Sequence, residues 1–171
     1  LANEASKKSD VVINDFFAYK PVQRKIKNQK ADIITAISCF YDMEEPNIFV
    51  EDVVKLLKED GIFVIQQNYL VQMLKQNAFD NIVHEHLEYY SLLSLNNLLN
   101  KHGLEVFDVE LRDLNGGSFK TYICFKGKRR ITKAVEKMIK HEKKLKLENK
   151  KIYLDFAKRI EKNRDKLINF I

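Results

Sequence analysis

The sequence lacks the features of a disulfide-stabilised or membrane-spanning protein. Its 171 residues include only two cysteines, Cys39 and Cys124, and both lie in apolar, strand-like surroundings. Two cysteines exclude a disulfide framework and a four-cysteine zinc site within this chain, so we expect buried, reduced thiols. No apolar run approaches the length of a membrane span, and no charged-then-apolar signal segment opens the chain. We therefore expect a soluble, cytoplasmic protein without a membrane partner.

Acidic residues are scarce in the last quarter of the chain. Residues 126–171 contain 17 Lys and Arg against 6 Asp and Glu, and because the whole chain carries +6, residues 1–125 carry −5. A basic helix can bind nucleic acid or an anionic membrane. Here lysines alternate with acidic and apolar residues, and no arginine cluster with interleaved aromatics is present. We interpret the charge as a solvated helix face and predict no nucleic-acid partner.

The first half of the chain alternates between strand-like and helix-like segments. Its length fits one domain, and because it starts at Leu1 on residues that resemble the end of a helix, we expect an internal piece of a longer protein. Pro46 suits the first turn of a helix, and Gly61 suits a helix C-cap. Strands are predicted at Val11 to Asn14, Ala31 to Ile37 and Gly61 to Ile65, with helices at Pro21 to Asn28 and Asn47 to Glu59. This alternation is typical of a parallel α/β sheet.

The second half predicts a helix, an antiparallel hairpin and two further helices. A helix at Leu92 to His102 precedes strands at Leu104 to Leu111 and Phe119 to Phe125, which are joined by a turn-rich segment. A parallel pair followed by such a hairpin gives a mixed sheet. Residues 131–171 contain neither glycine nor proline, and their apolar residues repeat at helical spacing with a Lys-rich break at 143–151. The second of these amphipathic helices needs a partner for its apolar face.

His84-Glu85-His86 holds two of the four histidines in the chain. The apolar strand that precedes it opens into polar residues, which is typical of a strand that ends at a ligand-binding sheet edge. Taken alone, the pair fits either ordinary loop histidines or a proton-transfer site. A zinc site that adds Cys39 or Asp42 lacks a third ligand fixed nearby, so we predict no metal.

Three segments carry a resemblance to a known family. They read Asp80-Asn-Ile-Val-His-Glu-His-Leu-Glu-Tyr-Tyr-Ser-Leu92, Lys101-His-Gly-Leu-Glu-Val-Phe-Asp-Val-Glu110 and Asn115-Gly-Gly-Ser-Phe119. In this order and spacing they resemble the S-adenosylmethionine-dependent C-methyltransferases, whose best understood branch acts on nucleotide-linked 4-keto deoxysugars. The resemblance covers essentially the whole chain.

The resemblance implies an α/β fold. Residues 1–126 would be the C-terminal part of a class I methyltransferase domain, which is Rossmann-like, with a mixed sheet that ends in an antiparallel hairpin. Residues 127–171 would be a basic two-helix extension that leads to a C-terminal domain outside this chain. The family's zinc-binding region would precede the chain.

The implied cofactor is S-adenosylmethionine. By resemblance, Asp15 would accept a hydrogen bond from the adenine amino group and Phe16 would pack on the ring, although Asp15 also fits a strand-end cap. Ala36, Ile37 and Ser38 would line the same pocket. The five glycines, at positions 61, 103, 116, 117 and 127, form no G-x-G to wrap the methionine end of the cofactor. We therefore expect an incomplete cofactor site and no turnover by the isolated chain.

The implied reaction removes a proton from the carbon next to a ketone and transfers a methyl group in line to the enolate. It needs a base near neutral pKa and a donor for the enolate oxygen. By resemblance, His86 would be the base and Glu85 would orient it. The residues that would contact a small-molecule substrate are His84, Tyr89, Tyr90, Asn115, Gly116, Gly117 and Ser118. The two glycines fit either a close approach of backbone to ligand or a tight turn.

Two departures leave the substrate open. The sugar enzymes often carry a tyrosine where this chain has Val83 and a histidine where it has Asn115. The alternative is a degenerate methyltransferase-like module that binds a partner through its basic helices without activity, and a homo-oligomer through those helices also fits. An RNA or protein methyltransferase is disfavoured, because residues 1–125 are acidic and lack the proline-aromatic motif of amide methylation.

Overall fold

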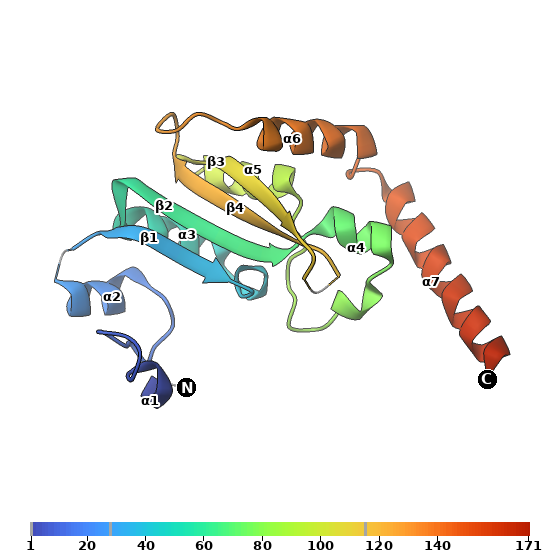
Figure 1. Ribbon diagram of the computed structural model, residues 1–171, viewed down its shortest axis with the longest axis horizontal. Coiled ribbons are helices and arrows are strands. Elements are labelled where there is room, and N and C mark those ends of the chain that lie inside the picture. The colour runs from blue at the N-terminus through green and yellow to red at the C-terminus, as the bar shows by residue number, and fades with distance from the viewer. Residues whose placement is uncertain (1, 28, 115) are drawn as a thin grey trace.

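Four strands form one mixed sheet in the computed structural model, which describes residues 2–27, 29–114 and 116–171 (Figure 1). The elements in chain order are α1 (Ala2–Ala5), α2 (Tyr19–Ile26), β1 (Ala31–Ile37), η1 (Phe40–Asp42), α3 (Pro46–Leu56), β2 (Leu57–Asn68), α4 (Leu70–Gln76), η2 (Phe79–Asn81), α5 (Leu92–Asn100), β3 (Leu104–Arg112), β4 (Ser118–Phe125), α6 (Lys133–Leu145) and α7 (Lys150–Phe170).

The strand order is β1-β2-β4-β3. β1 and β2 are parallel, with α3 as their crossover, whereas β4 runs antiparallel to both β2 and β3. The predicted α/β mixed sheet and its antiparallel hairpin are therefore confirmed. Pro46 occupies the first turn of α3, as predicted, because its missing amide proton costs nothing there.

One face of the sheet carries the core and the other is more open at β1. Phe63 and Ile65 of β2 are fully buried, and α3 and α5 lie behind the strands in Figure 1. Side chains alternate between the two faces of a strand. Ala36 points with Ile65 into the core, whereas Ile33, on the opposite face of β1, is 62% exposed. The carboxyl end of β2 thus lies in the middle of the sheet with helices on one side.

Phe40 is the centre of an aromatic cluster in this core. Its ring centroid lies 5.6 Å from Phe49, 6.4 Å from Phe63 and 5.4 Å from Tyr90. Tilted and edge-to-face contacts at such distances are favourable for aromatic rings. The cluster therefore anchors η1, which follows β1, to the segment that follows the His-Glu-His motif.

Two expectations from the sequence are wrong. Residues Val11 to Asn14 form no strand, because β-branched residues need a hydrogen-bonded neighbour strand, and β1 pairs only with β2 in the described ranges. Gly61 does not cap α3, which ends at Leu56. It lies inside β2, where a Cβ atom would sit 2.8 Å from Leu57 Cδ1, so glycine is needed for close packing.

The two C-terminal helices are confirmed, with a break at residues 146–149. α6 buries Val135 against the core, and the first half of α7 buries Phe156 against Met73 and Leu74 of α4. The end of α7 projects away from the sheet in Figure 1 and exposes Phe170. Among the described residues, no helix combines the length and apolar composition needed to cross a membrane.

Candidate functional site

The carboxyl end of β2 joins two segments that the sequence assigns to a binding site. The carbonyl of Gln66 accepts a hydrogen bond from Ser38 N at 2.8 Å, which holds the turn that follows β1. The side chain of Asn68 donates from Nδ2 to Asn81 Oδ1 at 2.7 Å. Ser38 and the segment that leads to His84 are thereby fixed to neighbouring positions of one strand.

Tyr69 and Leu70, which follow Asn68, bind the glycine turn and the segment after the His-Glu-His motif. Tyr69 N donates to Gly117 O at 3.2 Å, and Leu70 N donates to Tyr90 O at 3.0 Å. Because carboxyl ends of strands in α/β sheets are where ligands bind, this convergence identifies the candidate site. We call residues 66–70 the β2 hub.

His86 lies at this site in a defined tautomer. Its Nδ1 atom is 2.9 Å from Asn81 O, and its ring packs edge-on against Tyr41 with centroids 4.5 Å apart. A carbonyl oxygen only accepts, so Nδ1 donates the proton in this contact, and in the neutral ring Nε2 carries the lone pair. His86 can therefore accept a proton at Nε2. Asn81 and Tyr41 were not predicted, because nothing in their residue types marks a backbone acceptor or a packing surface.

Two carboxylates accompany the two histidines of the motif, one at each imidazole. Glu85 Oε1 is 3.2 Å from Nε2 of His84, whose side chain is 91% exposed, so the direct partner of Glu85 is His84. Asp42, which follows Tyr41 in η1, also faces this group: burial raises the pKa of Asp42, His86 lowers it and Glu85 raises it. The sequence pointed to Glu85 as the residue that orients His86, whereas the structure adds Asp42 as a second acidic neighbour.

The remaining predicted substrate contacts fall into two groups. The Tyr89 hydroxyl donates to Asn81 O at 3.2 Å, so Tyr89 lies beside His86. Tyr90 is 6% exposed in the aromatic cluster, where burial raises its pKa, and Ser118 is buried with its hydroxyl 3.5 Å from Arg112 O. Their packing suits core roles. Asn115 lies outside the described residues.

The Gly116-Gly117 turn packs directly against α4 and η2. Both residues have positive φ, 74° and 103°. A Cβ atom on Gly116 would lie 3.0 Å from Ala78 Cβ, and one on Gly117 would lie 2.5 Å from Gln72 Cβ. The glycines therefore serve a tight turn that closes on α4, and through Gly117 O that turn is bonded to the β2 hub.

Alanine at position 117 is expected to lower the free energy of unfolding by about 2–4 kcal/mol, because it combines backbone strain with a steric clash. Gly103→Ala is the matched control: Gly103 also has positive φ, 74°, but nothing lies within 4 Å of its Cβ position, so about 1 kcal/mol is expected. Urea unfolding of the two variants measures both losses. Equal losses would contradict the close packing of the turn on Gln72.

The predicted adenine-side residues differ in accessibility. Phe16 is 92% exposed and lines a hollow of about 230 Å³ together with Met43. The Oδ1 atom of Asp15 accepts a hydrogen bond from Phe16 N at 2.8 Å. Ser38 has a left-handed backbone, with φ 53°, and Ile37 is exposed, whereas the Ala36 side chain is buried in the core. An open aromatic face and a free carboxylate oxygen fit an adenine ring and its amino group.

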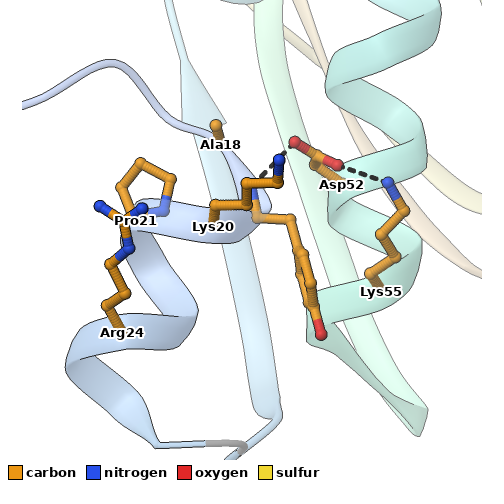
Figure 2. Close-up of a pocket in the computed structure, with 7 residues that line it drawn as sticks. Ala18, Lys20, Pro21, Arg24, Asp52 and Lys55 are labelled. Carbon is orange, nitrogen blue, oxygen red and sulfur yellow. Dashed lines mark hydrogen bonds and ion pairs between the residues drawn. The ribbon is translucent and has the colours of Figure 1, made fainter.

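Asp52 of α3 fixes the segment that follows Phe16. It lies between α2 and α3 (Figure 2), where it lines a hollow of about 370 Å³. Its Oδ2 accepts a hydrogen bond from Tyr19 N and its Oδ1 accepts one from Lys55 Nζ, both at 2.8 Å. Phe17 packs on Phe49 at 4.7 Å between centroids. Asp52 was not predicted, and its one signal is an acidic residue within the apolar face of a helix.

The described residues contain no group of three or more His, Cys, Asp and Glu side chains that could hold a metal ion. His84 contacts the Glu85 carboxylate, whereas His86 contacts the carbonyl oxygen of Asn81. The Asp42 carboxylate, whose pKa His86 lowers, can stabilise an imidazolium ion at His86.

Comparison with known families and sequences gives consistent matches. Residues 2–109 match the methyltransferase domain family, and residues 113–171 match the family of C-methyltransferase C-terminal domains. C-methyltransferase NovU of Streptomyces niveus is 34% identical over 135 residues, which cover 78% of this chain and 32% of NovU. The chain thus spans about a third of the length of that relative.

Solved structures show the same fold at low identity. A chain from the complex of the Haloferax volcanii Trm112 methyltransferase activator with a methyltransferase has a TM-score of 0.53 and 13% identity, covering 72% of this chain and 66% of that one. The O-methyltransferase NcsB1 from neocarzinostatin biosynthesis, in complex with S-adenosylmethionine and 2-hydroxy-5-methyl naphthoic acid, has a TM-score of 0.50 and 15% identity, covering 72% and 35%. The fold is that of class I methyltransferases, and the chain belongs to the S-adenosylmethionine-dependent C-methyltransferase family.

Proposed function

We propose that the protein to which this chain belongs methylates a carbon atom next to a ketone, with His86 as the general base. The observation that carries the proposal is the hydrogen bond from His86 Nδ1 to Asn81 O, which leaves Nε2 free to accept a proton. Histidine has an unperturbed pKa suited to this step. Family membership supplies the reaction class.

In the proposed reaction, Nε2 of His86 removes a proton from the carbon beside the ketone. The electron pair of that C–H bond becomes the C=C bond of an enolate, and the charge moves to oxygen. The resulting imidazolium would be stabilised by the carboxylate of Asp42. Glu85, whose direct partner is His84, would add a second negative charge within the motif. Nδ1 keeps its proton and its hydrogen bond to the Asn81 carbonyl oxygen throughout, so the ring keeps its orientation.

The methyl donor of the family is S-adenosylmethionine, whose sulfonium methyl group is the electrophile that the enolate carbon would attack in line. In this chain, Asp15 and Phe16 would hold the adenine, and Ala36, Ile37 and Ser38 would line the same pocket. The exposed ring of Phe16 supports this assignment. The methionine end would be held by residues outside this chain, because no G-x-G is present.

The proposed substrate is a small molecule, a nucleotide-linked keto-deoxysugar, in a cytoplasmic enzyme. The three sequence motifs support this class. We further propose that residues 1–126 complete a methyltransferase domain and that residues 127–171 lead to a further domain, with a zinc-binding region before the chain. The exposed end of α7 suits self-association.

The test is methyl transfer by the full-length protein from S-[methyl-¹³C]adenosylmethionine to a nucleotide-linked 4-keto-deoxysugar. The expected product carries a ¹³C-methyl group on carbon, which NMR separates clearly from an O-methyl group by chemical shift. An O-methyl product would contradict the proposed reaction. No product, with cofactor bound, would favour a binding module without activity.

A further inference from the structure

Gln67 is a buried side chain whose hydrogen-bonding capacity is unused. It is 1% exposed, and neither Nε2 nor Oε1 has a partner among the described residues. A side-chain amide offers two N–H donors and one acceptor oxygen, and buried polar groups are almost always paired. Both ends of this amide are therefore available to a molecule that reaches them.

The position of Gln67 is at the centre of the β2 hub. The residues on either side bond to Ser38, which directly follows β1, and to Asn81, whose carbonyl holds His86. By strand alternation, Gln67 lies on the same sheet face as Phe63 and Ile65, and it is paired across the sheet with Phe119. It is thus at the ligand-binding end of the strand, on the face where Phe63 contacts the Phe40 ring.

We propose that the Gln67 amide binds the substrate through two hydrogen bonds. Nε2 donates to the ketone oxygen, and Oε1 accepts from a hydroxyl group of the substrate. This inference rests on the proposed function, since it assigns the donor that the enolate requires. It also narrows the substrate class to ketones that carry a hydrogen-bond donor, such as a hydroxyl group, close to the carbonyl, because such a molecule satisfies both ends of the amide.

The amide transfers no proton itself. His86 takes the proton from carbon, the C–H electron pair forms the enolate, and the negative charge develops on the oxygen that Gln67 Nε2 contacts. A hydrogen bond to an oxygen strengthens as that oxygen becomes charged, so the contact stabilises the transition state more than the bound ketone. Its loss should therefore lower kcat as well as raise KM.

The test compares Gln67→Leu with Thr121→Val in the full-length protein. Thr121 is a fully buried polar residue on the same sheet face, but its hydroxyl is already paired with Ile65 O at 3.3 Å. Gln67→Leu is expected to keep or raise the melting temperature and to reduce kcat/KM for methyl transfer by about 100-fold or more. Thr121→Val is expected to lower the melting temperature and to keep kcat/KM within about threefold.

Each other outcome overturns the inference. A Gln67→Leu enzyme with unchanged kcat/KM would show that the amide does not touch the substrate, while the proposed function would stand on the activity of the wild type. A Gln67→Leu protein that is both inactive and less stable would assign the amide a purely structural role. If the wild type itself transfers no methyl group, the proposed function falls first, and the inference falls with it.

Discussion

Replacement of His86 by alanine is expected to reduce kcat for methyl transfer by about 10²- to 10⁴-fold, the range typical for loss of a general base. The affinity for S-adenosylhomocysteine should be unchanged, because His86 contacts Asn81 O and Tyr41 rather than the adenine-side residues. Initial rates and calorimetric titration of the full-length protein measure the two quantities separately.

His141→Ala is the matched control for this variant. His141 is an exposed histidine of α6, so its loss removes the same side chain from the basic extension and should leave kcat within about twofold, as expected for an exposed position. A His86→Ala enzyme that retains full activity would show that another group removes the proton. Loss of cofactor binding in that variant would instead assign His86 to the cofactor site.

Glu142→Ala is expected to lower the free energy of unfolding by roughly 3–5 kcal/mol. The Glu142 carboxylate is fully buried and accepts three hydrogen bonds: from the Tyr69 hydroxyl at 2.8 Å, from Leu92 N at 2.7 Å and from Leu93 N at 2.8 Å. Its removal leaves two buried donors and one partly buried donor without this partner, and it takes the negative charge away from the N-terminus of α5.

Glu148→Ala serves as the control, since Glu148 is exposed between α6 and α7 and its loss should change stability by no more than about 0.5 kcal/mol. Tyr69→Phe removes one of the three donors and should cost about 1 kcal/mol. Urea denaturation measures the free energy of unfolding of all three variants. A loss below 1 kcal/mol for Glu142→Ala would contradict the role of this carboxylate.

Glu142 also explains how the basic extension is attached. Its carboxylate accepts a hydrogen bond from Tyr69 of the β2 hub. It also accepts hydrogen bonds from the amides of Leu92 and Leu93, and so caps α5, the helix that follows the His-Glu-His motif. Burial and the adjacent Glu142 carboxylate raise the pKa of Tyr69, which keeps the phenol protonated as the donor in this hydrogen bond at neutral pH. The extension and the candidate site therefore form one packed unit.

The local features of the fold followed from the sequence. Strand Ala31 to Ile37, the hairpin and the two C-terminal helices have regular periodicity and clear turn residues, which act over short distances. Residues Val11 to Asn14 and Gly61 were misassigned because their structure depends on contacts with other residues rather than on local periodicity. A strand requires a neighbour to pair with, and the role of a glycine depends on which side chain packs against its α-carbon.

Within the candidate site, only the His-Glu-His motif was predictable from the sequence. His86 stands out by residue type, but its tautomer depends on a carbonyl five residues earlier, and Asp42 approaches it from another strand end. Glu142 is one acidic residue in a Lys-rich helix, and Gln67 follows a similar glutamine. Their roles depend on burial and on partners distant in sequence, which periodicity does not encode.

The most direct test of the central claim is hydrogen exchange at the substrate carbon. The full-length enzyme is incubated in D₂O with S-adenosylhomocysteine and a nucleotide-linked 4-keto-deoxysugar, and NMR follows the proton next to the ketone. Exchange by the wild type, reduced at least about 100-fold in His86→Ala, is the expected result. Equal exchange by both proteins would contradict the assignment of His86 as the base.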